Sequence, residues 1–487
     1  MIQNINFERK FSRNFYKNLK LPLAEMIFTN RPLKTNRGDI YPVIISEGRY
    51  SEDLVNNKYY FKPQGSAYTT HLIGRVNPYS SYEIAIDKLC DGAKAGIYIS
   101  HKDNLFIYAK RVGSSAEIYY KLEENDVKIG SCDYCDDSAF IFTLHAGSFI
   151  ETYVKIDDVI THIADAKVEA LECLIEEDVF SSTNAALYVE SSGECSVNSL
   201  LNYLDSGVMQ ADIKPVKYEN GEVLIDNGKI YFTYSSRFET ACMQQIVSYK
   251  LSSCELELVG ALLFDSGDGK WCQDVASSLM YDRDASLWRL WVCVFSHGHR
   301  FAYAESKNDL RFGINVVDVK PVDWVENHLD FGGIQGDEDP DFIHNDKDNK
   351  WYLSICRYDP DCTKYRYYLF CSDRADGGYQ YVSRTDDSVE TTGGSFVRFN
   401  GEIYFCFGRA FGEIAKYDVC AFPSMKKLGE LQCNYNDGGF RGWGSVFEIP
   451  CGTRKRLLWA TFDRTLGSSY NWSYGNLYFY ESKTMKV

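Results

Sequence analysis

The chain lacks the segments that direct a protein into or across a membrane. Its first 28 residues carry basic side chains, but they contain no apolar run followed by a small-residue cleavage site. No stretch of the sequence is long and apolar enough to span a bilayer. We therefore expect a cytoplasmic protein that has no membrane partner.

Positive charge is also scarce. Lys and Arg number 52 against 68 Asp and Glu, which gives a net charge of −16. An acidic surface of this size repels nucleic acid and anionic membranes. The sequence also lacks a G-x-S-x-G elbow, a P-loop and a dinucleotide fingerprint at a strand-to-helix junction. These absences argue against nucleic-acid binding, nucleotide chemistry and serine hydrolysis.

Cysteine is plentiful, with 16 residues, but its pattern does not indicate a metal centre. Many of the cysteines lie within apolar strand sequence, where a free thiol behaves as a small buried hydrophobe. A large chain without an export signal keeps such thiols reduced. Cys132 and Cys135 form a C-x-x-C pair, but zinc needs a second pair or nearby histidines, and neither is adjacent. We expect no metal ligands.

The composition favours an all-β protein of two domains. Aromatic residues make up 15% of the chain, with 36 Tyr and 29 Phe, and 487 residues exceed one ordinary core. Residues 55–195 read as short alternating strands separated by turns rich in Gly, Asp, Asn and Ser. This spacing predicts a β-sandwich over residues 1–205, including an N-terminal extension.

A hairpin pattern recurs five times in the second half of the chain. Each copy is an apolar strand, a turn and an aromatic-rich strand, and successive copies start 50 to 63 residues apart. The copies are VLIDNGKIYFTY (223–234), SLMYDRDASLWRLWVCVF (278–295), DFIHNDKDNKWYLSIC (341–356), SFVRFNGEIYFCFG (395–408) and SVFEIPCGTRKRLLWATF (445–462). One hairpin per blade predicts a five-bladed β-propeller over residues 206–487. We expect residues 212–218 to close the ring as an outermost strand.

The propeller geometry predicts which polar residues meet. Residues just before the inner strand and just after the second strand of every blade share one face. The candidates before the inner strands are Glu222, Asp274, Asp337, Asp339 and Trp443, and those after the second strands are Arg237, His297, His299, Arg357, Arg409 and Arg464. Each could belong to a structural ion pair, but buried charge concentrates where function requires it. We therefore predict one polar site at this face.

Two of these blades carry motifs that resemble a known group of enzymes. Glu338-Asp339-Pro340-Asp341-Phe342-Ile343, an Asn/Asp turn and Lys350-Trp351-Tyr352-Leu353 resemble the blade that carries a catalytic-site Asp in glycoside hydrolase family 43. Residues 301–306 followed by Asn308-Asp309-Leu310 resemble the third strand common to these propellers. The architecture of residues 212–487 is similar to the five-bladed glycosidases of families 32, 43 and 117 and the phosphorylases of family 130. Residues 95–111 resemble the lectin-like jelly-roll modules that accompany many glycosidases.

The resemblance implies a glycoside hydrolase with paired carboxylates. It assigns Asp339 to the third-blade motif, Glu222 to the first-blade base or nucleophile, and Asp274 to the second blade. The fourth blade departs from family 43, because Thr392 stands where the acid Glu is expected and Glu390 lies two residues earlier. The lack of an export signal favours exo-action on small oligosaccharides. The alternatives are a non-catalytic carbohydrate-binding protein and a lyase or phosphorylase on the same scaffold.

The remaining candidates would bind substrate. Arg237, Arg357, Arg409 and Arg464 favour an anionic sugar such as a uronic acid, since guanidinium binds carboxylates in bidentate fashion. The alternative is that each arginine orients a catalytic carboxylate. His297 and His299 are expected to donate hydrogen bonds to the substrate rather than to bind metal. The expected cofactor is none, with a structural ion on the propeller axis left open.

Overall fold

The computed structural model describes the chain except residues 29–33, 36–37, 40, 101, 103, 146–147, 322–336, 360–361, 387–390, 410–415, 437–443, 452, 464–474 and 487. The chain folds into two compact units. The first contains Met1–Leu19, Ser206–Phe238 and Cys242–Val487, and the second contains Lys20–Asp205 and Glu239–Ala241. Among the described residues, no helix is both long and apolar enough to cross a membrane.

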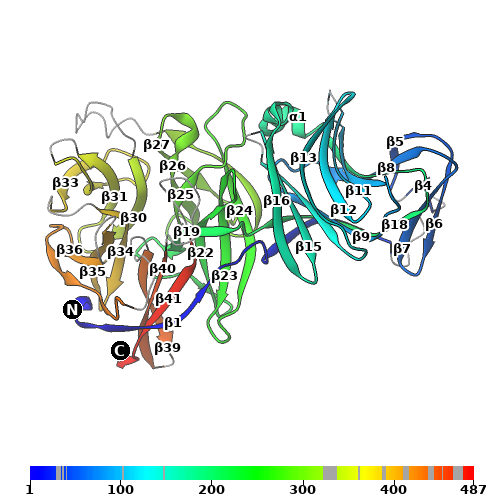
Figure 1. Ribbon diagram of the computed structural model, residues 1–487. Helices are drawn as coiled ribbons and strands as arrows, with labels where there is room; N and C mark the ends of the chain where they lie inside the picture. Colours follow the sequence, from blue (N-terminus) through cyan, green and yellow to red (C-terminus); the bar gives the residue numbers. More distant parts are fainter. Residues whose placement is uncertain are drawn as a thin grey trace. The chain divides into compact units, whose positions relative to one another are not determined.

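The first unit is a five-bladed β-propeller, as the hairpin pattern predicts (Figure 1). From the axis outward, the blades consist of the following strands. Blade 1 has β19 (Met209–Pro215), β22 (Lys229–Arg237), β23 (Cys242–Lys250), β24 (Leu256–Asp265) and β28 (Gly313–Asp318), with β21 (Ile225–Asp226) beside β22. Blade 2 has β25 (Val275–Asp282), β26 (Leu287–Val294), β27 (Arg300–Ser306) and β29 (Lys320–Pro321), with β20 (Lys217–Tyr218) on the inner side of β25.

The other three blades follow the same order. Blade 3 has β30 (Asp337–Asn345), β31 (Lys350–Asp359), β32 (Lys364–Ser372) and β33 (Gln380–Arg384). Blade 4 has β34 (Thr391–Phe399), β35 (Glu402–Arg409), β36 (Tyr417–Ala421) and β37 (Lys427–Glu430). Blade 5 has β39 (Gly444–Cys451), β40 (Arg454–Phe462), β41 (Leu477–Ser482), β1 (Asn6–Arg13) and β38 (Gln432–Cys433), and β42 (Met485–Lys486) also pairs with β40. Two 3₁₀ helices, η1 (Ile2–Asn4) and η3 (Phe295–His297), complete the unit.

The first hairpin copy is the one that the sequence pattern places wrongly. Copies two to five each supply the two innermost strands of a blade. In blade 1 the innermost strand is instead β19, which pairs with β22 from Met209 to Pro215, while residues 223–228 contribute only the short β21. The chain leaves β19 and makes an excursion over residues 216–228 before it starts β22.

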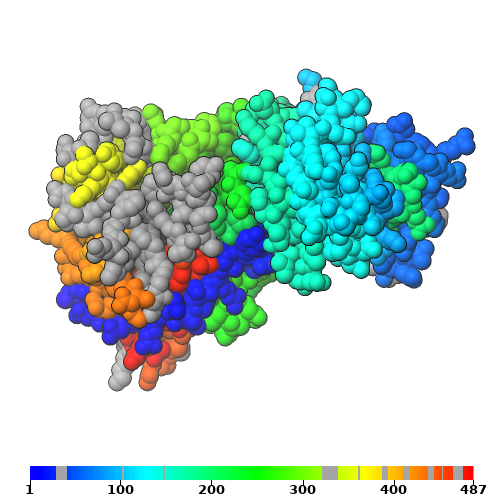
Figure 2. Space-filling model, viewed as in Figure 1, coloured from blue at the N-terminus to red at the C-terminus, as the bar shows by residue number. Residues whose placement is uncertain are grey.

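The ring is closed by the N-terminal strand and not by residues 212–218. β1 pairs antiparallel with β41, from Phe7 opposite Ser482 to Arg13 opposite Leu477. Figure 1 shows β1 running along β41, and in Figure 2 the surface of the N-terminal residues adjoins that of the C-terminal ones. The expected closing segment is an innermost strand, so the exposed edge of β41 is covered by a strand from the other end of the sequence.

Apolar side chains pack between each pair of neighbouring blades. Separate buried clusters join blades 1 and 2, 2 and 3, 3 and 4, and 4 and 5. Between blades 5 and 1, Phe232 packs against Phe447 and Phe479 with ring centroids 5.7 and 5.8 Å apart. Phe11 of β1 stacks on Phe479 at 4.7 Å, so the closing strand also contributes to this junction.

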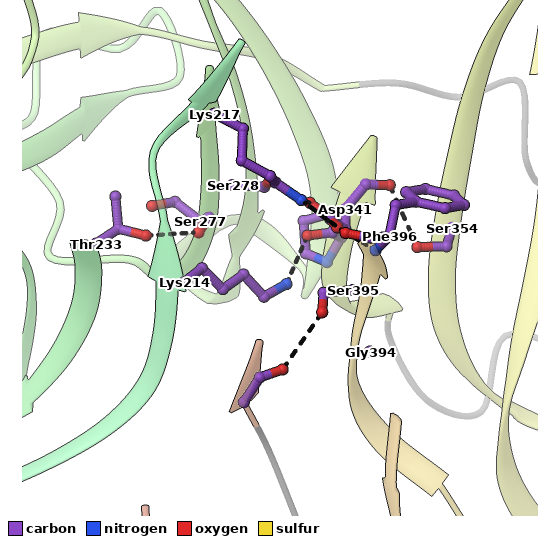
Figure 3. A network of polar contacts seen from close by, with 12 residues as sticks. Lys214, Lys217, Thr233, Ser277, Ser278, Asp341, Ser354, Gly394, Ser395 and Phe396 are labelled. Carbon is purple, nitrogen blue, oxygen red and sulfur yellow. Dashed lines mark hydrogen bonds and ion pairs between the residues drawn. The ribbon is translucent and has the colours of Figure 1, made fainter. Parts of the chain in front are cut away.

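A buried polar network joins the blades at the axis (Figure 3). Asp341 of β30 is fully buried and accepts hydrogen bonds from three other blades or their extensions. Lys217 Nζ lies 2.8 and 3.1 Å from its two carboxylate oxygens, Ser278 Oγ donates at 2.7 Å, and the Phe396 amide donates at 2.7 Å. These donors belong to the excursion after β19, to blade 2 and to blade 4.

Further contacts continue this network around the ring. Thr233 Oγ1 of blade 1 donates to the Ser277 carbonyl of blade 2 at 3.1 Å, and Ser395 Oγ of blade 4 lies 3.5 Å from the Gly444 carbonyl of blade 5. Lys214 Nζ of blade 1 donates to the Pro340 carbonyl of blade 3 at 2.7 Å. Blades 1 and 3 are not neighbours in a five-membered ring, so this last contact crosses the axis.

Two large antiparallel sheets make up most of the described part of the second unit. One sheet has the order β13 (Asn125–Asp133), β12 (Ser115–Leu122), β11 (Leu105–Val112), β10 (Lys94–Ser100), β17 (Asn184–Ser191), β8 (Ala67–Arg75) and β5 (Val43–Glu47). The other has β16 (Val159–Lys167), β15 (Phe149–Ile156), β14 (Ala139–His145), β9 (Ser81–Lys88), β18 (Cys195–Asp205), β7 (Lys58–Pro63) and β6 (Tyr50–Val55), and β2 (Lys20–Ile27) also pairs with β18. Both sheets contribute to one apolar core.

Short elements connect these strands. They are β3 (Lys34–Thr35), β4 (Gly38–Asp39), the 3₁₀ helix η2 (Glu169–Ile175) and the helix α1 (Glu177–Phe180). The assignment of this unit as a lectin-like sandwich stays a prediction.

Truncating the buried Phe7 of the closing strand should destabilise the propeller. Phe7 is 3% exposed and packs edge-on against Trp459 at 5.8 Å. We expect Phe7→Ala to lower the free energy of unfolding by about 3–5 kcal/mol. Leu428→Ala, on the outer strand of blade 4, is the control and should change it by less than about 0.5 kcal/mol, since Leu428 is 40% exposed. Equal effects in chemical denaturation would contradict the assigned closure.

Removing one partner of the Lys217–Asp341 ion pair should lower the free energy of unfolding more than replacing both partners with apolar residues. Asp341→Asn leaves the Lys217 ammonium buried without its counter-charge, so we expect a loss of about 3–5 kcal/mol in the free energy of unfolding. The double variant Lys217→Met/Asp341→Leu should be less destabilised than Asp341→Asn, because both charges leave together. Glu402→Gln, which breaks the exposed Lys347–Glu402 pair, is the control. Additive losses in the double variant would show that the pair is not coupled.

Candidate functional site

The candidate site lies where the innermost strands begin and the second strands end. We call this face the mouth. β19, β25 and β30 begin here, and β22, β26 and β31 end here, because the strands of each hairpin are antiparallel. The polar residues that flank these strand ends therefore surround the axis, as the sequence pattern predicts.

Four of the five innermost strands carry the same irregularity close to the mouth. The pairing with the second strand shifts between Ala211 and Lys214, Val275 and Ser278, Glu338 and Asp341, and Thr392 and Ser395. At each shift one residue adopts a left-handed conformation: Asp212 (φ 51°), Ala276 (φ 59°), Asp339 (φ 50°) and Gly393 (φ 63°). A non-glycine residue in this region costs about 1–3 kcal/mol, and such bulges redirect side chains beside functional sites.

Asp339 and Asp212 occupy equivalent positions in blades 3 and 1. Asp339 is 6% exposed, and its Oδ2 accepts a 2.9 Å hydrogen bond from the Gly393 amide at the bulge of blade 4. Both carboxylates act on the ammonium of Lys214. Burial lowers the pKa of Lys214, and the negative charges of Asp341, Asp339 and Asp212 oppose that effect. Carboxylates from two bulges therefore lie near one buried cation.

Asp274 precedes β25 and is 3% exposed. Its carboxylate accepts hydrogen bonds from the Ser296 amide at 2.9 Å and the Ser296 hydroxyl at 2.7 Å. Burial raises the pKa of Asp274, while the Ser296 hydrogen bonds and the charge of His297 act in the opposite direction. The net upward direction favours the protonated form, which a general acid requires.

The charges of Asp274 and Asp212 both act on the thiol of Cys242, the first residue of β23. Burial raises the pKa of the Cys242 thiol to about 11, with the charge of Arg237 opposing the rise and the charges of Asp274 and Asp212 adding to it. The charge of Asp212 thus affects the pKa of two groups. It affects that of Cys242 together with Asp274, and that of Lys214 together with Asp339. The mouth brings together carboxylates of blades 1, 2 and 3.

The turn after β26 presents both predicted histidines. Ser296 Oγ lies 2.8 Å from His297 Nδ1, and His297 Nε2 lies 3.2 Å from Asp268 Oδ2, so a hydrogen-bonded chain leads from Asp274 to the surface. His299 has φ 57° and places Nε2 3.3 Å from Glu338 Oε1. Its ring lies 4.4 Å from that of Phe295, which is 44% exposed. An exposed aromatic ring is a surface on which a sugar can stack.

The predicted arginines differ from one another in their surroundings. Arg409 is engaged inside blade 4, where its guanidinium contacts Asp418 at 2.9 Å and Glu430 at 2.5 Å. This arrangement is a structural ion pair, the alternative that the sequence leaves open for each polar candidate at this face. Arg357 is 8% exposed at the end of β31, and Arg237 is half-buried at the end of β22 beside Cys242.

The structure does not bring Glu222 to the mouth. Glu222 is exposed and lies 3.7 Å from Arg283, which directly follows β25 at the opposite end of the blades. The first-blade position that the resemblance gave to Glu222 is occupied by Asp212. Trp443 and Arg464 lie outside the described residues, as does Glu390, and the side chains of Asp337 and Thr392 are also outside the described part.

Sequence reasoning missed Asp212, although a signal was present. Only four residues, Val223 to Asp226, separate Glu222 from the Asn227-Gly228 turn, which is too short for a strand that crosses a blade.

The bulge also explains the Gly393-Gly394 pair. Gly393 adopts the left-handed conformation, and a Cβ on Gly394 would lie 2.4 Å from Phe405 and 2.7 Å from Tyr367.

The arrangement offers carboxylates in contrasting surroundings but no preformed metal cluster in the described part of the chain. No group of three or more His, Cys, Asp or Glu side chains among those residues is placed to hold a metal ion. On the axis, the positive charge next to Asp341 is the ammonium of Lys217. Carboxyl groups with different surroundings are what acid–base chemistry at a glycosidic bond requires.

Comparisons with known proteins show similarity to glycoside hydrolase structures. No family model matches the chain, and no curated protein matches it. A thermostable family-43 glycoside hydrolase is 14% identical, with 58% of this chain and 91% of that chain covered and a TM-score of 0.39. A Xanthomonas citri family-43 enzyme complexed with xylose is 11% identical (57% and 90% covered, TM-score 0.40). A Coprinopsis cinerea family-62 α-L-arabinofuranosidase is also 11% identical (58% and 93% covered, TM-score 0.39). Similarity at this level assigns no activity to the chain.

Proposed function

We propose that the protein is a glycoside hydrolase that acts on small oligosaccharides at the propeller mouth. The observation that carries the proposal is the placement of Asp212, Asp274 and Asp339 at the mouth ends of the innermost strands of three blades, two of them at strained bulges. Glycoside hydrolysis needs one protonated carboxyl group and one ionised carboxylate. A site that holds carboxyl groups in contrasting surroundings meets this requirement.

Asp274 is proposed as the general acid. Its burial raises its pKa, so a larger fraction stays protonated near neutral pH than for an exposed aspartic acid. Asp212, in the first-blade position, is proposed as the base or nucleophile, and Asp339 as the carboxylate beside it. This assignment moves the acid from the fourth blade, where family 43 has it, to the second.

The residues around these carboxylates would hold the sugar. Phe295 offers an exposed ring for stacking, and His297 and His299 offer imidazole nitrogens at the same turn. Arg237 and Arg357 are proposed to meet an anionic group, because they lie at the ends of the second strands of blades 1 and 3, at the mouth. The assay should therefore include both neutral and uronic substrates.

Replacing either bulge carboxylate should abolish turnover. Wild type is assayed on nitrophenyl glycosides and on neutral and uronic oligosaccharides, with and without inorganic phosphate. We expect Asp212→Asn and Asp339→Asn to lower kcat by about 10²–10⁴-fold, because each removes a charge that the transition state needs. Glu222→Gln should retain the wild-type rate, since Glu222 lies at the opposite end of the blades.

The same assay separates the alternatives. Binding measured by calorimetry without product from any substrate would show a carbohydrate-binding protein. Phosphate-dependent turnover would show a phosphorylase, and an ultraviolet-absorbing unsaturated product would show a lyase. A wild-type rate in both Asp212→Asn and Asp339→Asn would place the chemistry elsewhere.

The pH profile tests the role of Asp274. A general acid must be protonated, so kcat should fall as pH rises through the raised pKa of Asp274. The Ser296 hydroxyl lowers that pKa, so Ser296→Ala should raise it further and move the descending limb to higher pH. His297→Gln should move the limb in the same direction by less, and His344→Gln, at the far end of β30, should leave it in place. A limb that stays fixed in Ser296→Ala would exclude Asp274 as the acid.

A further inference from the structure

Lys214 is a buried lysine that crosses the propeller axis. It lies on β19 of blade 1, is 4% exposed, and donates from Nζ to the Pro340 carbonyl of blade 3 at 2.7 Å. Figure 3 shows the Lys214 side chain extending from its strand toward the segment that carries Asp341. Burying an ammonium group costs several kcal/mol per ion. An apolar side chain of similar length would fill the same space without that cost, so the charge calls for an explanation.

The acceptor of this hydrogen bond belongs to the bulge that carries Asp339. In β30, Glu338 pairs with Cys356 and Asp341 pairs with Ser354, so Asp339 and Pro340 together stand opposite a single residue of β31. The Pro340 carbonyl is thus outside the regular ladder, and Lys214 supplies it with a donor. Lys214 therefore holds the Pro340–Asp341 peptide, at the end of the bulge that begins with Asp339.

The donor follows the equivalent bulge in its own strand. In β19, Ala211 pairs with Ser235 and Lys214 pairs with Thr233, so Lys214 is the first paired residue after the bulge that contains Asp212. One side chain therefore connects the two bulges that orient Asp212 and Asp339. The negative charges of Asp339 and Asp212 also act on its ammonium group, together with Asp341 and the opposing charge of Lys217.

Lys217 provides the comparison within the same axis. It too is a buried lysine, at 3% exposure, but its ammonium pairs with Asp341, two residues beyond the bulge residue Asp339. Its other contact in this network is with the Phe396 carbonyl at 3.4 Å. The two lysines thus share burial and charge, and they differ in whether they hold the bulge.

We propose that Lys214 is a positioning residue of the mouth, which holds the Asp339 bulge against the Asp212 bulge and places a positive charge beside both carboxylates. This inference rests on the proposed hydrolase function. The ammonium group holds the two bulges, and with them the two aspartates, in one orientation during the reaction. Substrate does not need to touch Lys214 for this role.

The test compares Lys214→Met with Lys217→Met, using the substrate that wild type hydrolyses best in the nitrophenyl and oligosaccharide panel. Folding of each variant is first established by circular dichroism and chemical denaturation. We expect Lys214→Met to lower kcat about 10²-fold with an unchanged KM, because misplacement of a reacting group affects the transition state more than binding.

Lys217→Met should lose stability while it keeps the wild-type kcat. Lys214→Gln, which retains a shorter donor without the charge, should recover part of kcat. If both lysine variants lose stability and neither changes kcat, Lys214 has only a structural role and the proposal is wrong. The same conclusion holds if Lys217→Met folds and neither Lys214 variant does. If wild type hydrolyses no substrate, the proposed function itself fails, a result distinct from either.

Discussion

The five sheets of the propeller share no strands, and the buried Asp341 carboxylate connects several of them by hydrogen bonds at the axis. Its oxygens accept hydrogen bonds from Lys217, Ser278 and the Phe396 amide, which come from different parts of the ring. Apolar packing between neighbouring blades supplies area, but it is local to each junction. The Asp341 carboxylate links blades 2 and 4, which share no apolar cluster among the described residues. Removing either Asp341 or Lys217 alone would leave the other charge buried without its partner.

The hydrogen-bonded network on the axis lies directly next to the bulges that form the mouth. Asp341 is regular strand, whereas Asp339, two residues nearer the mouth, is in a bulge with φ 50°. The bulge turns a side chain away from the alternation of a strand and toward the opening, at a conformational cost that packing elsewhere must offset. The same bulge recurs in four blades, so the backbone at the mouth is similar in each of them. The residue at the bulge therefore decides which chemical group each blade presents to the mouth.

Sequence patterns predicted the five-bladed ring because copies two to five keep inner and second strand contiguous, so that both are visible in one short window. Blade 1 breaks this rule, since residues 216–228 separate β19 from β22, and the pattern then selected Glu222 instead of Asp212. Ring closure by β1 was not predictable for a related reason. Pairing between residues 6–13 and 477–482 is a contact between distant segments, and no local periodicity reports it. The positions of Asp274 and Asp339 at the mouth could be predicted because each residue directly precedes or begins a contiguous hairpin.

Blades 1, 3 and 4 place different chemical groups at their bulges. Blade 4 places Gly393 at the bulge, and its neighbour Gly394 has no room for a Cβ because Phe405 and Tyr367 fill that space. The blade therefore supplies a backbone amide, which donates to Asp339, where blades 1 and 3 supply carboxylates. Gly393, which stands where blades 1 and 3 have Asp212 and Asp339, has no side chain, so the bulge of blade 4 supplies no carboxyl group. Under the proposed function, the proton donor is assigned to Asp274 of blade 2, because burial rather than a second carboxylate raises its pKa and the Ser296 turn holds it in place.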